Sequence, residues 1–177
     1  GQSNSILGAN AGDAITTGAL NTYVGTFAGS ASTTVSNNTA IGAFAFDAGT
    51  GGDNTAVGSG ALGGSSNSAT ANVALGKDAG NSISSGSYNT IAGALAGDGI
   101  TSGDHNTAMG YNALGANTVG DRTVAIGSGA LRLQNPATNT DMYNTAVGYD
   151  AGQAVTTGSE NTLIGGLSGD AITTGAS

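Results

Sequence analysis

Residues 38–45 read Asn-Thr-Ala-Ile-Gly-Ala-Phe-Ala, and this stretch sets the pattern of the whole chain. The motif Asn-Thr-apolar-apolar-Gly recurs ten times with small variations, and Thr123 replaces the asparagine in one copy. Alanine follows three residues after the glycine in nine copies, and Ser168 in the tenth. The glycines of the motif are Gly8, Gly25, Gly42, Gly58, Gly76, Gly93, Gly110, Gly127, Gly148 and Gly165. A register kept over ten copies identifies a tandem repeat of about 17 residues.

The composition would by itself predict disorder. The 177 residues include 33 glycines, only 8% are charged, and the formal net charge is −8. A chain with few large apolar side chains buries too little surface to offset its conformational entropy. A regular repeat offers another source of stability, because identical units can stack their backbones and hydrogen-bond to one another.

Each unit carries a second, weaker stretch after the motif. It reads Ile-Thr-Thr-Gly at 15–18 and returns as Ile-Ser-Ser-Gly at 83–86 and Val-Thr-Thr-Gly at 155–158. Two short stretches rich in β-branched residues, separated by Gly, Asn and Asp turn signals, predict two strands per unit. We therefore expect an all-β fold: a parallel β-solenoid, or β-roll, of ten coils with two short strands each, spanning residues 1–177 as one domain. The asparagines would then form a side-chain ladder.

Both residues before the motif glycine are apolar in every copy, as in Ala40-Ile41 and Ala56-Val57. Neighbouring residues of a strand point to opposite faces, so this strand is apolar on both. One face can fill the interior of the coil, and the other needs cover. Side-by-side association of chains would supply it; the alternative is a monomer whose two strands face each other through different rows.

The motif resembles the head repeats of YadA-like trimeric autotransporter adhesins, and similar repeats occur in bacteriophage fibres and other bacterial surface fibres. The stretches that carry the resemblance are Ala40-Ile41-Gly42-Ala43-Phe44-Ala45 and Ala125-Ile126-Gly127-Ser128-Gly129-Ala130. The resemblance implies a left-handed β-roll, a parallel homotrimer, and an elongated rod at a cell or virion surface. The repeat here is longer than the usual adhesin unit, and its second half lacks the usual strand.

Charge and composition narrow the classes of partner. Lys77, Arg122 and Arg132 are the only basic residues, so no basic face exists for nucleic acid. No apolar run is long enough to span a membrane as a helix, so we do not expect membrane embedding. The chain contains no cysteine, which is compatible with the extracellular, surface or virion location that the resemblance implies.

The longest unit runs from Gly127 to Gly148 and predicts an insertion loop at 132–143, which contains the single proline. Loops on rigid scaffolds often carry recognition. Arg132 and Tyr143 would suit contact with a glycan or a protein, and Asn135 and Asn139 complete the candidate recognition loop. The alternative is an insertion without a function of its own.

No catalytic or metal site is legible. His105 is the single histidine, so a zinc set and a positioned Ser-His-Asp arrangement are not expected. The recurring aspartates, such as Asp98 and Asp78, could bind calcium if stacked, but they also suit turns. We expect no enzyme activity and no cofactor.

The sequence thus predicts a structural or adhesive fibre segment, a trimeric shaft or head that mediates attachment or spaces a binding tip. A filament subunit that stacks end to end is an alternative. So is a ligand-binding solenoid, specific for a glycan or, through its regularly spaced Thr-Thr pairs, for ice.

Overall fold

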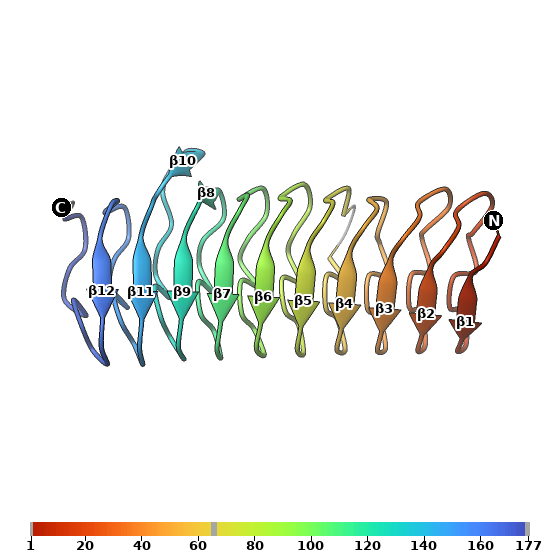
Figure 1. Ribbon diagram of the computed structural model, residues 1–177, viewed down its shortest axis with the longest axis horizontal. Helices are drawn as coiled ribbons and strands as arrows, with labels where there is room; N and C mark the ends of the chain where they lie inside the picture. The colour runs from red at the N-terminus through yellow and green to blue at the C-terminus, as the bar shows by residue number, and fades with distance from the viewer. Residues whose placement is uncertain (1, 65–66, 176–177) are drawn as a thin grey trace.

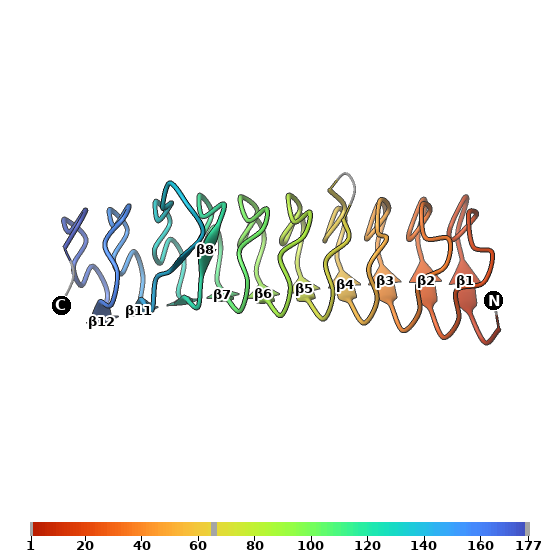
Figure 2. The same cartoon turned by 90° about the horizontal axis from the view of Figure 1, so that it is seen from above.

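The computed structural model describes residues 2–64 and 67–175, and residues 1, 65, 66, 176 and 177 of the predicted domain lie outside it. The described chain is a rod in which the repeat strands lie side by side along the long axis, one per coil (Figure 1; Figure 2). The strands are β1 (Ser5–Leu7), β2 (Thr22–Val24), β3 (Thr39–Ile41), β4 (Thr55–Val57), β5 (Val73–Leu75), β6 (Thr90–Ala92), β7 (Thr107–Met109), β8 (Gly120–Asp121), β9 (Val124–Ile126), β10 (Thr140–Asp141), β11 (Thr145–Val147) and β12 (Thr162–Ile164).

One parallel sheet of ten strands runs the length of the described rod, in the order β1-β2-β3-β4-β5-β6-β7-β9-β11-β12. Its register aligns the repeat motif with itself: Ala40 pairs with Ala56, and Ala56 with Ala74. The described residues form no helix. The predicted parallel β-solenoid with coils of about 17 residues is confirmed.

The second stretch of the unit differs from the prediction of two strands per coil. In the described residues only β8 and β10 lie outside the main sheet, and they pair with each other. Elsewhere the chain curls: the successive N–H groups of Thr101, Ser102 and Gly103 all donate to the carbonyl of Thr118, at 2.9, 3.1 and 3.3 Å. Amides that converge on one acceptor bend the backbone, so the stretch stacks between coils without becoming extended.

The interior is narrow, and each coil fills it with one or two large side chains. The middle residue of each strand points inward, and so does the residue four positions after the motif glycine. Where the first is large the second is glycine, and a Cβ on Gly29 would lie 2.5 Å from the ring of Tyr23. Where the first is Ala40, the second is the buried Phe46. The same exchange occurs in the pairs Ile91/Gly97, Ala56/Leu62, Ala108/Leu114 and Ala125/Leu131. A large side chain at one position is thus matched by a small residue at the other in these coils. In the coils of Ala74/Gly80 and Ala146/Gly152 both positions are small, and Ile83 and Val155 are the large buried side chains.

The asparagines form the expected column, with most bonds running from side chain to backbone. The Oδ1 of Asn21 accepts the N–H of Asn38 in the next coil at 2.9 Å, and its Nδ2 donates to the carbonyl of Val35 at 2.8 Å. Each amide therefore clamps the turn that leads into the following coil. The buried members are Asn21, Asn38, Asn54, Asn72, Asn89, Asn106, Asn144 and Asn161. Buried polar groups satisfied in this way fix the register of the coils.

Gln134 supplies the missing amide group where Thr123 interrupts the asparagine column. Gln134 is fully buried, its Nε2 donates to the Thr123 hydroxyl at 2.9 Å, and its Oε1 accepts from Asn144 at 2.8 Å. The longer side chain of Gln134 thus spans the gap that the short threonine leaves. The interior remains hydrogen-bonded across this coil.

Replacing a motif glycine should destabilise the rod strongly. Gly93 has φ of 137°, and a Cβ there would lie 2.5 Å from the Gly110 carbonyl oxygen. Strain and clash together predict that Gly93→Ala lowers the free energy of unfolding by about 3 kcal/mol, measured by urea denaturation. Gly166→Ala is the control, because the nearest atom to a Cβ at that position is 3.9 Å away. Equal effects of the two changes would contradict the role of the motif glycines.

The repair by Gln134 can be tested with a compensating pair. Gln134→Val removes the bridge between Thr123 and Asn144, and we expect a loss of about 1–3 kcal/mol in unfolding free energy. Thr123→Asn with Gln134→Val gives the coil the residues that the next coil has at Asn144 and Val155. The double variant should recover most of the loss in urea denaturation. An additive loss would show that Gln134 does not replace the missing amide.

Candidate functional site

The insertion breaks the regularity of the coils, and its irregular part begins after Asn135. The Oδ1 of Asn135 accepts both the N–H and the hydroxyl of Thr118, at 3.2 and 2.7 Å, so Asn135 still occupies a regular position. Residues 136–140 then stand where the preceding coil has only 119–120. This segment and β10 rise from the rod (Figure 1).

Two buried side chains hold the insertion against the preceding coil. Pro136 and Met142 are both buried, and side-chain atoms of each lie 3.1 Å from the position that a Cβ on Gly120 would take. The insertion therefore packs closely against Gly120. β10 also pairs in parallel with β8, so the base of the insertion is fixed on its neighbour.

A bulge follows β10 and turns Met142 inward. Asp141 pairs with Asp121 and Thr145 pairs with Val124, so residues 142–144 face only 122–123. The additional residue disrupts regular pairing and redirects the chain. Its effect here is to bury Met142 and to leave the flanking Asp141 and Tyr143 exposed.

The four residues of the predicted recognition loop have different surroundings. Asn139 lies exposed in the insertion, whereas Asn135 serves as an acceptor for Thr118. Arg132 is half-buried in a regular part of the coil. Among the described contacts, no hydrogen bond or ion pair joins its side chain to Tyr143. Only Tyr143 enters a defined polar cluster.

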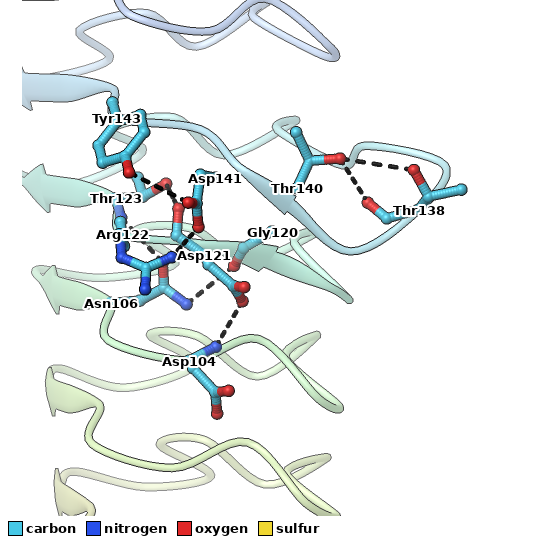
Figure 3. Close-up of polar contacts among 10 residues, drawn as sticks. All are labelled: Asp104, Asn106, Gly120, Asp121, Arg122, Thr123, Thr138, Thr140, Asp141 and Tyr143. Atoms are coloured by element: carbon cyan, nitrogen blue, oxygen red, sulfur yellow. Dashed lines mark hydrogen bonds and ion pairs between the residues drawn. The ribbon is translucent and has the colours of Figure 1, made fainter.

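That cluster consists of Arg122, Asp141 and Tyr143 (Figure 3). The guanidinium of Arg122 forms an ion pair with Oδ1 of Asp141, and the Tyr143 hydroxyl donates to Oδ2 at 3.0 Å. Both carboxylate oxygens are engaged, and the side chains of Arg122 and Asp141 remain 45% and 40% exposed. The sequence analysis missed Arg122 as a site residue, although it stands one unit before Tyr143 at the same repeat position.

Arg122 and Tyr143 belong to a column that we call the rim column, formed by the residue before the asparagine position of each unit. Its members all have left-handed backbone conformation, with φ between 50° and 64°. They are Ser3, Leu20, Asn37, Asp53, Ala71, Tyr88, His105, Arg122, Tyr143 and Glu160. Tyr88 and His105 stack with ring centroids 4.9 Å apart and planes 4° apart. Tyr88, His105, Arg122 and Tyr143 thus follow one another on four successive coils.

In the Thr pairs that suggested an ice-binding face, the first residue bonds to the next coil, whereas the second, such as Thr157, is exposed. The first hydroxyl of a pair donates to a carbonyl of the next coil, as from Thr101 to Thr118 at 3.0 Å and from Thr156 to Thr173 at 3.2 Å. Ser84 does the same toward Thr101 at 3.1 Å. These hydroxyls are committed to stacking the coils.

The recurring aspartates occupy turns. Asp78 and Asp150 adopt left-handed backbone conformation, which aspartate tolerates better than most residues. Burial raises the pKa of Asp98, and the nearby negative charge of Asp78 raises it further. Within residues 2–64 and 67–175, no three His, Asp or Glu side chains are grouped so as to hold a metal ion.

The described residues also form no pocket and no helix that could cross a membrane. No family model matches the chain, and comparisons with curated proteins and with solved structures likewise find no match.

Proposed function

We propose that the chain is a segment of a parallel homotrimeric fibre, displayed on a cell or virion surface, that mediates attachment or spaces a binding tip. The observation that carries the proposal is an uncharged outer face on the sheet. The trimer, its surface location and its adhesive role follow the resemblance to YadA-like head repeats. The solenoid is a suitable scaffold, because coils that keep one register place the same repeat positions on the same side of the rod along its whole length.

Two outward rows make up this face. The threonine row contains the first residue of each strand: Ser5, Thr22, Thr39, Thr55, Val73, Thr90, Thr107, Val124, Thr145 and Thr162. The aliphatic row contains the third: Leu7, Val24, Ile41, Val57, Leu75, Ala92, Met109, Ile126, Val147 and Ile164. The middle residue between them faces the core. Every member of the two rows whose exposure is described is exposed or half-exposed in the single chain.

The chemistry of these rows is restricted to uncharged residues. None of the 14 charged residues, 3 basic and 11 acidic, lies in either row. The rim column, which is also outward, varies from Leu20 to Asp53, His105 and Glu160. A row that meets only water can vary freely, whereas a row buried against another chain must exclude charge. The restriction therefore favours a continuous contact along the sheet.

A parallel arrangement suits this face best. Each coil presents one hydroxyl or small residue and one aliphatic residue at a spacing of about 4.8 Å, so parallel copies can align coil by coil about a common axis. An exposed apolar stripe of this length would be unusual on a soluble monomer. Burial of the aliphatic row would give each chain the large apolar contact that its thin core lacks.

A matched pair of leucines tests the proposal. Leu75 in the aliphatic row is 43% exposed, and Leu133 outside both rows is 41% exposed. Leu75→Glu would place one carboxylate per chain in the shared contact and should dissociate the trimer, because buried like charges repel and lose hydration. Leu133→Glu should leave the trimer intact.

Sedimentation equilibrium gives the mass, and far-UV circular dichroism checks that both variants remain folded. A monomeric unchanged protein would overturn the trimer. Dissociation by both variants, or by neither, would overturn the assignment of the contact to the sheet face.

A further inference from the structure

Four successive members of the rim column, Tyr88, His105, Arg122 and Tyr143, combine flat rings with fixed polar groups. Tyr88 is 59% exposed and Tyr143 54% exposed, and His105 and Arg122 are exposed as well. The column lies outside the threonine and aliphatic rows. The backbones of this column already bond to the preceding coil, as from His105 N–H to the Ser87 carbonyl at 3.1 Å, and its side chains add a ring stack and an ion pair between successive coils on the exposed surface.

The rings offer a stacking surface at one end. His105 covers one face of Tyr88. In the preceding coil the same repeat position is Ala71, whose methyl group is too small to cover the other face. That face of Tyr88 can therefore pack against a flat, partly apolar ring from outside the chain.

The polar end is pre-organised and locally neutral. Asp141 neutralises Arg122 and also accepts from Tyr143, which fixes the guanidinium while its remaining N–H groups stay available as donors. The nearby carboxylates are turned to the backbone: Asp104 accepts the Ser87 N–H at 2.6 Å, and Asp121 accepts the Asp104 N–H at 2.7 Å. A paired guanidinium on a chain of net charge −8 favours a neutral hydrogen-bonding partner over an anion.

We propose that this part of the rim column binds a neutral oligosaccharide along the rod axis. A sugar ring stacks its C–H face on Tyr88, and hydroxyls further along the chain accept hydrogen bonds from Arg122 and meet the oxygens of Tyr143 and Asp141. Tyr88 and Arg122 are two coils apart, which is roughly 10 Å at the usual strand spacing, so the ligand spans more than one sugar unit. The proposal goes beyond the fibre role and holds for any number of associated chains.

The test measures binding of neutral hexasaccharides of glucose, mannose, galactose and N-acetylglucosamine to the assembled protein by isothermal titration calorimetry, with hexagalacturonate as the acidic comparison. Tyr88→Ala removes the stacking ring at a position whose neighbour Ala71 already has the same backbone conformation. Arg122→Lys keeps the charge and removes the planar fork. Tyr111→Ala is the matched control, because Tyr111 is 57% exposed and lies outside the rim column.

We expect at least one neutral hexasaccharide to bind, with affinity reduced at least tenfold in Tyr88→Ala and in Arg122→Lys and unchanged in Tyr111→Ala. Absence of neutral binding, binding of hexagalacturonate alone, or any other pattern among the three variants overturns the proposal. Circular dichroism and sedimentation of each variant separate a lost site from a lost fold. The mass of the unchanged protein tests the trimer independently of saccharide binding, so failure of this site and failure of the trimer can be told apart.

Discussion

Hydrogen bonding between the backbones of successive coils is the constraint on which this structure depends. The strands of the main sheet are only three residues long, and turns make up most of the remainder of each coil, yet many of its N–H groups donate to carbonyls of a neighbouring coil. A buried amide without a partner is costly, so the coils must keep one register. The buried asparagines reinforce that register because their side chains bind the turn of the next coil. Stability therefore comes from repetition more than from a large core.

A fixed backbone register leaves the core side chains free to vary from coil to coil. Tyr23 above a glycine and Phe46 beside Ala40 fill the same narrow interior by different routes. Gln134 shows the same tolerance for polar groups, since it bridges the gap at Thr123. The insertion after Asn135 is accepted for a similar reason: Pro136 and Met142 seal it against Gly120 before the regular coil resumes. Local irregularity thus stays local, as expected where each unit contacts only its neighbours.

The rod also separates its possible contacts by position. The threonine and aliphatic rows form one uncharged face, which we propose packs against other chains. The rim column carries the varied, partly aromatic residues, which we propose meet a saccharide. A solenoid can carry both contact surfaces because the residues of one repeat position form one column over its full length. The chemistry of one column does not depend on that of its neighbours.

The repeat register by itself determined the solenoid, the coil length, the asparagine column and the presence of an insertion, because periodic glycines and inward alanines admit few other arrangements. The sequence did not determine the backbone of the second stretch, where three amides share the Thr118 carbonyl although β-branched residues favour strands. Nor did it reveal that Leu20, Tyr88 and Arg122 adopt left-handed conformations, since no local preference favours them; the inter-coil bonds impose them. Among the described contacts no hydrogen bond or ion pair joins Arg132 to Tyr143, whereas Arg122, Asp141 and Tyr143 meet. Only the stacking of coils decides such neighbours, because residues about one unit apart become adjacent.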